Sequence, residues 1–76
     1  FVFHGAIDPF VTKDEFDLFV KEMNEAKINF QVIQYSNTVH SFTDKNSGND
    51  ISKGGAYNQY ADENSFMITK EFISSL

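Results

Sequence analysis

The hydrophobic pattern of the chain changes its period along the sequence, and each change marks a predicted element. Residues 1–4 (Phe-Val-Phe-His) form an apolar run that stops at Gly5, a pattern that favours a buried strand of a parallel sheet. Residues 30–35 (Phe-Gln-Val-Ile-Gln-Tyr) are rich in apolar and β-branched residues and predict a second strand. A segment with helical periodicity lies between the two.

This middle segment predicts an amphipathic helix that begins at Thr12 and ends near Lys27. Thr12 and Glu15 have the spacing of a capping box, and Val11 and Phe16 are placed to form a hydrophobic staple. Apolar residues then recur at intervals of three and four, so that one stripe packs on a sheet. The stripe contains Phe16, Phe19, Val20, Met23 and Ala26.

The second half of the chain predicts a surface loop followed by a helix. Residues 43–55 are Asp, Asn, Ser, Lys and Gly with Ile51 as the only large apolar residue, which is typical of a loop. A last helix is expected from Asp62 to Ser74, with acidic residues in its first turn, where the helix dipole favours them. Its expected buried face contains Ala61, Ser65, Ile68, Phe72 and Leu76.

The order of elements predicts an α/β fold: a β-α-β-α arrangement of two parallel strands with flanking helices. A strand-helix-strand unit joins two parallel strands through a right-handed crossover. The carboxyl ends of both strands then lie at the same edge of the sheet, and ligand sites of open α/β sheets lie outside that edge. Asp8 follows the first strand, where Pro9 excludes it from helical backbone, and His40 follows the second. Adjacent strands are about 4.8 Å apart, so we expect Asp8 and His40 to meet.

Length and composition set the scale of the domain. A chain of 76 residues forms one small domain with a thin core, although 41% hydrophobic residues and nine Phe indicate a folded interior. The sequence opens inside an apolar run, so we expect residues 1–76 to be a single partial domain cut from something longer.

Charge and residue usage exclude several classes of partner. The net charge is −5 and the six basic residues are all Lys, which argues against nucleic acid as a partner. The apolar runs are far shorter than the roughly 20 residues that span a bilayer, so no membrane partner is expected and the cytoplasm is the default location. The chain has no Cys for a thiolate metal site, and no metal or other cofactor is expected.

Asp8 and His40 are the candidate catalytic residues. A neutral imidazole accepts a proton from a nucleophile only if its other nitrogen donates, and a carboxylate on that nitrogen fixes the tautomer. Asp before His, each just past a parallel strand, matches the last two members of an α/β-hydrolase triad. None of the seven Ser lies in a Gly-x-Ser-x-Gly elbow, so the chain lacks a recognisable nucleophile.

Three segments together resemble the C-terminal third of the dienelactone hydrolase family. They are residues 4–11 (His-Gly-Ala-Ile-Asp-Pro-Phe-Val), 35–43 (Tyr-Ser-Asn-Thr-Val-His-Ser-Phe-Thr) and 48–65, which includes Gly-Gly-Ala-Tyr-Asn. The resemblance implies an α/β-hydrolase fold in which Asp8 orients His40 and His40 activates an upstream Cys or Ser. It also implies cleavage of ester or lactone bonds of small carboxylic substrates through an acyl-enzyme. Lys27 departs from the family, which usually has Gly there, so either the turn differs or Lys27 is left-handed.

Other interpretations stay open at this stage. The chain could be a non-catalytic relative that serves as an interaction module, and Asp8 could be a plain turn residue. His4 precedes Gly5, a pair that can line an oxyanion hole, but its place on a strand favours a structural role. Residues 44–55 resemble a calcium loop, yet Asn49 and Gly55 stand where Gly and Glu are required, so a solvated loop is favoured. An uncovered strand edge predicts that the isolated chain self-associates.

Overall fold

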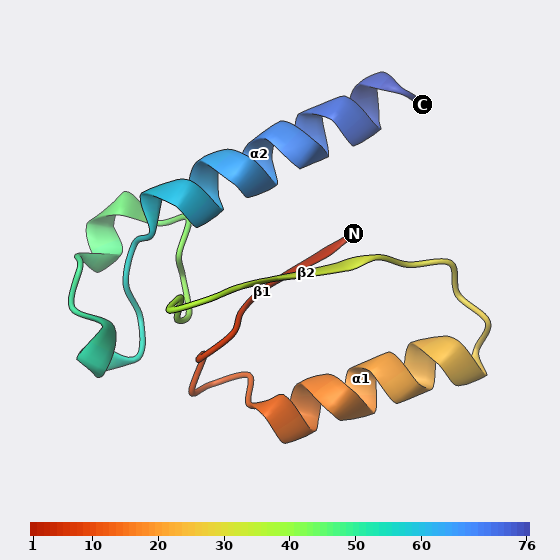
Figure 1. The fold of residues 1–76 in the computed structure, drawn as a ribbon, viewed down its shortest axis with the longest axis horizontal. Helices are drawn as coiled ribbons and strands as arrows, with labels where there is room; N and C mark the ends of the chain where they lie inside the picture. The colour runs from red at the N-terminus through yellow and green to blue at the C-terminus, as the bar shows by residue number, and fades with distance from the viewer.

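The computed structural model describes residues 1–76 and contains two strands and two α-helices that alternate along the chain (Figure 1). The elements are β1 (Val2–Gly5), α1 (Lys13–Glu25), β2 (Val32–Tyr35) and α2 (Gln59–Ser74), with short 3-10 turns at Lys45–Ser47 and Ile51–Lys53 before α2. This order confirms the predicted β-α-β-α arrangement. No helix combines the length and the apolar character needed to cross a membrane.

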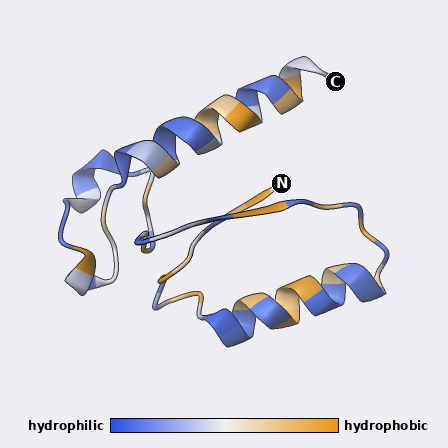
Figure 2. Ribbon diagram, viewed as in Figure 1, coloured by the Kyte–Doolittle hydropathy of each residue, from blue (hydrophilic) through white to orange (hydrophobic).

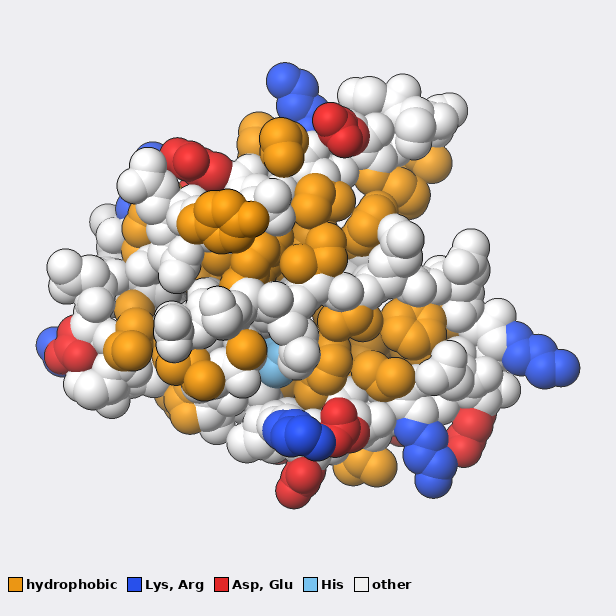
Figure 3. Space-filling model, viewed as in Figure 1, with side chains coloured by type: hydrophobic (Ala, Val, Ile, Leu, Met, Phe, Trp, Pro, Cys, Tyr) orange, Lys and Arg blue, Asp and Glu red, His pale blue; other side chains and the backbone are white.

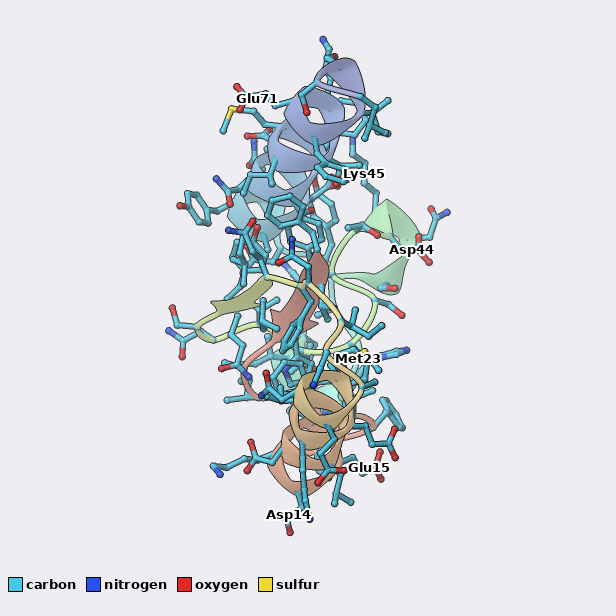
Figure 4. All side chains as sticks on the ribbon, turned by 90° about the vertical axis from the view of Figure 1, so that its right-hand side faces the viewer. Asp14, Glu15, Met23, Asp44, Lys45 and Glu71 are labelled. Atoms are coloured by element: carbon cyan, nitrogen blue, oxygen red, sulfur yellow. The ribbon has the colours of Figure 1, made fainter.

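The two strands pair in parallel, as the crossover predicted. Their register runs from Val2 opposite Val32 to Gly5 opposite Tyr35. The helices α1 and α2 lie on opposite sides of this strand pair (Figures 1 and 4). Because the strands are parallel, the loops that follow them both leave from the same edge of the sheet.

The second strand begins two residues later than the sequence predicted, at Val32 instead of Phe30. Val32 lies opposite Val2, the first residue of β1, and the Val2 amide donates to the carbonyl of Gln31 at 2.8 Å.

Helix α1 has the predicted cap and an unusual end. Thr12 is its N-cap, and the Thr12 hydroxyl accepts from the Glu15 amide at 3.4 Å. At the other end Lys27 has φ 57°, and the amides of Lys27 and Ile28 donate to the carbonyls of Asn24 and Met23. This is a Schellman motif, which normally has Gly at its left-handed position. The left-handed alternative for Lys27 is the correct one.

Helix α2 begins at Gln59, three residues before the predicted Asp62. Asn58 decides the boundary, because its side-chain oxygen accepts from the Ala61 amide at 2.9 Å and caps the helix. The Asn58 amide group also donates to the Thr38 hydroxyl at 3.2 Å. The cap therefore attaches the start of α2 to the turn that follows β2.

The core is small and does not extend along the whole helices. Its buried apolar residues are Phe16, Tyr35, Val39, Ala56 and Ala61. Figure 2 shows hydrophilic and hydrophobic segments alternating along both helices, and Figure 3 shows hydrophobic side chains gathered between them. On the face predicted for α2, Ala61 and Ser65 are buried, whereas Phe72 and Leu76 are exposed. In the stripe predicted for α1, Phe16 is buried and Phe19, Val20 and Met23 are half-buried, but Ala26 is exposed.

Candidate active site

Asp8 lies on a tight turn directly after β1. Its amide donates to the Gly5 carbonyl at 3.1 Å, and its side chain is only 6% exposed. Carboxylate oxygen Oδ1 accepts from the amides of Phe10 and Val11 at 2.8 and 3.0 Å. Pro9, which has no amide hydrogen to donate, sits between these donors and Asp8. The turn thus fixes one oxygen of the carboxylate and leaves Oδ2 free to face the second loop.

His40 is held by main-chain contacts on both of its sides. Its amide donates to the Gly54 carbonyl, and its own carbonyl accepts from the Ala56 amide, each at 3.1 Å. The polar loop therefore returns to form a short parallel bridge between His40 and Gly55. Ser41, the next residue, has φ 60°, so the backbone is strained directly beside the histidine.

The two loops bring the predicted pair together. His40 Nδ1 lies 3.0 Å from Asp8 Oδ2, within the hydrogen-bonding distance expected from the parallel topology. An ionised carboxylate only accepts, so the neutral ring carries its proton on Nδ1 and donates it to Asp8. Nε2 then keeps its lone pair and has no partner in the structure, and the His40 side chain is 48% exposed. Such an imidazole can accept a proton from a group placed before it.

The electrostatics of the pair favour an ionised Asp8. Burial by itself would raise the pKa of the Asp8 carboxyl, but the hydrogen bonds from the Val11 amide, the His40 ring and the Phe10 amide outweigh it. The pKa of Asp8 therefore falls below its ordinary value. A carboxylate that stays ionised can stabilise the imidazolium that forms when His40 takes up a proton.

Two glycines set the distance between the loops, and the sequence pattern did not single them out for this role. A Cβ on Gly5 would lie 2.5 Å from the Thr38 carbonyl oxygen and 2.7 Å from that of Val39. A Cβ on Gly54 would lie 3.0 Å from Pro9 Cγ, and Gly54 has φ 84°. Both positions require a residue without a side chain because backbone or ring atoms approach closely. The sequence offered one signal for this role, which is that Gly5 stands at the end of the apolar run of residues 1–4.

An open cleft of about 540 Å³ lies beside the pair. Asp8, His40 and Glu15 line it together with aromatic side chains, among which are Phe3, Phe16, Phe19 and Phe42. Phe10, which the sequence pattern did not indicate either, packs its ring against the edge of His40 with centroids 5.4 Å apart. Aromatic side chains therefore form much of the apolar surface beside the imidazole.

His4 and the acidic loop do not join the pair. His4 is buried and stacks on Phe16, with ring centroids 4.4 Å apart. Asp44 and Asp50 accept from the amides of Asn46 and Ser52 and so cap the two 3-10 turns. Figure 4 shows Asp44 far from the acidic residues at the start of α1, and nowhere do three or more His, Asp or Glu side chains gather as metal ligands. The acids of this loop have a local structural role.

A parallel strand pair with flanking helices, and an Asp and a His on the loops at its carboxyl edge, define part of an α/β-hydrolase fold. The dienelactone hydrolase family profile matches residues 1–76, and the chain belongs to that family.

The chain is also similar to two individual proteins. An uncharacterized protein of Caenorhabditis elegans is 35% identical over 72 residues, which are 95% of this chain and 46% of that protein. The crystal structure of a dienelactone hydrolase-like promiscuous phosphotriesterase from metagenomic libraries matches with a TM-score of 0.87 and 35% identity. That match covers 99% of this chain and 31% of the other. The chain thus spans less than half the length of both.

Proposed function

We propose that this chain supplies the histidine and carboxylate of a hydrolase that cleaves ester or lactone bonds of small carboxylic substrates. The observation that carries the proposal is the 3.0 Å hydrogen bond between His40 Nδ1 and Asp8 Oδ2, with Nε2 left unpartnered. Membership of the dienelactone hydrolase family supports the class of reaction. The chain acts as the C-terminal portion of an α/β-hydrolase domain.

In this mechanism His40 transfers one proton in each half of the reaction. Nε2 takes the proton of a Cys or Ser nucleophile, which attacks the ester carbonyl and forms an acyl-enzyme as the alcohol leaves with that proton. Nε2 then takes a proton from water, the resulting hydroxide attacks the acyl carbon and releases the acid, and Nε2 returns that proton to the Cys or Ser. Asp8 keeps the ring in the productive tautomer and offsets the positive charge at each step.

The nucleophile comes from outside residues 1–76. In α/β-hydrolases the chain order is nucleophile, acid, histidine, so the elbow precedes Asp8. Oxyanion donors likewise come from strands and loops that this chain does not contain. The 76-residue chain alone should therefore hydrolyse an activated ester no faster than free imidazole does.

The test is ester hydrolysis by the protein that carries this chain at its full natural length. With a nitrophenyl acetate, His40→Ala should remove nearly all of the rate, because it removes the imidazole whose Nε2 would accept the nucleophile's proton. Asp44→Asn, on the exposed 3-10 turn, is the matched surface control and should leave the rate unchanged.

The opposite result has a definite meaning. If His40→Ala keeps the rate within about tenfold of the unsubstituted protein while the fold is intact, the pair is not catalytic. If the unsubstituted protein does not hydrolyse the ester, the alternative takes its place: a non-catalytic relative that acts as an interaction module. A Gly or Ala at the elbow position upstream would point to the same conclusion.

A phosphotriester is the second candidate substrate. The neighbour with a TM-score of 0.87 is described as a promiscuous phosphotriesterase, and the open cleft beside His40 leaves room for a tetrahedral centre. The same nucleophile and base would attack phosphorus in place of carbon. The hydrolysis rates of an aryl phosphotriester and of the aryl ester should be measured in the unsubstituted protein and in His40→Ala. Loss of both activities in the variant would show that one site serves both substrates.

A further inference from the structure

His4 uses both of its ring nitrogens, although it lies outside the Asp8–His40 pair. Nε2 lies 2.9 Å from the Val11 carbonyl oxygen, and Nδ1 lies 3.0 Å from Nε2 of Gln34. The residue is only 6% exposed, and its ring lies parallel to the Phe16 ring, with an interplanar angle of 6°. The histidine therefore joins three separate elements: β1, β2 and the turn before α1.

The partners determine which nitrogen of His4 carries the proton. A carbonyl oxygen can only accept, so Nε2 must carry a hydrogen and donate it to Val11. Nδ1 then accepts from the amide group of Gln34. One neutral tautomer satisfies both contacts, and turning the ring over would break both.

These contacts lead directly to the carboxylate. His4 holds the carbonyl of Val11, and the amide of the same residue donates to Asp8 Oδ1 at 3.0 Å. Asp8 Oδ2 in turn lies 3.0 Å from His40 Nδ1. A short series of hydrogen bonds thus runs from the sheet, through Val11 and Asp8, to the candidate base.

We propose that His4 is a positioning residue for the Asp8–His40 pair. Its two hydrogen bonds tie the turn at residues 8–11 to the sheet, so that the carboxylate faces His40 in one orientation. The proposal rests on the proposed function for its effect on rate. Its effect on the geometry of the pair is independent of that function.

The experiment compares two substitutions of His4 in the full-length protein. His4→Phe keeps an aromatic ring for Phe16 but loses both hydrogen bonds, and should lower kcat for an aryl ester about tenfold with little change in KM. His4→Gln places an amide donor near the Val11 carbonyl and should recover most of that loss. Met23→Ala, in α1 and outside the cleft, lowers stability without touching the turn and serves as the control.

Proton NMR of the His40 Nδ1 hydrogen provides a readout that does not depend on activity. A hydrogen shared with a carboxylate resonates far downfield, and this signal should be present in the unsubstituted protein and in Met23→Ala. His4→Phe should weaken or remove it, because the Asp8 carboxylate is no longer held in one orientation.

Each outcome decides the proposal. A His4→Phe protein with the His40 signal and kcat of the Met23→Ala control would overturn it and leave His4 as a core residue. Loss of the His40 signal in His4→Phe would support the positioning role of His4 even if His40→Ala kept its activity. Unchanged activity of His40→Ala would overturn the proposed function alone. If His4→Phe does not fold, Gln34→Met removes only the Nδ1 partner; a weaker signal then supports the proposal and an unchanged one overturns it.

Discussion

The exchange of Asp8 for Asn is the sharpest test of the pair because it changes almost no volume. Oδ1 of the Asn can still accept from the amides of Phe10 and Val11, so the turn should keep its shape. The atom that faces His40 Nδ1 becomes an NH₂ group, which only donates. His40 must then accept at Nδ1 and carry its proton on Nε2.

This tautomer has no lone pair on the nitrogen that would face the nucleophile. The loss in kcat should therefore approach the roughly 10⁴-fold that the same Asp-to-Asn change costs a serine protease, or about 5 kcal/mol of transition-state stabilisation. KM should change little, since Asp8 contacts the histidine and not the substrate. The structural consequence is small and the catalytic one is large.

The assay is steady-state hydrolysis of an aryl ester by the full-length protein, with thermal unfolding measured in parallel. Asp50→Asn is the matched control, because the Asp50 carboxylate also accepts a backbone amide but belongs to an exposed 3-10 turn. A folded Asp8→Asn protein that keeps its kcat within about tenfold of the control would refute the tautomer argument.

Four further predictions concern stability and association. The pKa of Asp8 is lowered in the folded protein, so the carboxylate contributes stability above the ordinary carboxyl pKa of 3.8, and this contribution is lost as pH falls through the pKa in the folded protein. The urea midpoint of the unsubstituted protein should therefore drop more steeply in acid than that of Asp8→Asn. Gly5→Ala should lower the free energy of unfolding by about 3 kcal/mol, because the new Cβ would clash with backbone oxygens. Gly48 has open space around it, so Gly48→Ala should cost only about 1 kcal/mol for its positive φ. Equal losses of the two variants in denaturant titrations would contradict the close-packing argument. Lys27→Gly should raise the melting temperature, with up to about 1 kcal/mol gained by relieving the left-handed lysine, and an unchanged or lower value would count against it. The isolated 76-residue chain should self-associate through its open strand edges and exposed apolar side chains, which a monomer in sedimentation at micromolar concentration would exclude.

Several features of this protein were open to prediction because they depend on neighbours in the sequence. The spacing of Thr12 and Glu15 predicted the start of α1, and the apolar stripe from Phe16 predicted its buried side. The strand-helix-strand order predicted parallel strands, and parallel strands place the loops of Asp8 and His40 at one edge. The contact between this pair followed from topology alone, without any side-chain detail.

Other features depend on contacts between segments that are distant in the sequence, and only the tertiary structure decided them. Gly5 matters because the backbone after β2 presses against it. His4 illustrates the same limit: the sequence shows a histidine on a strand, but its partners lie 7 and 30 residues away. A local pattern records periodicity and caps, whereas the orientation of a buried polar ring is set by whichever donors and acceptors the fold brings to it.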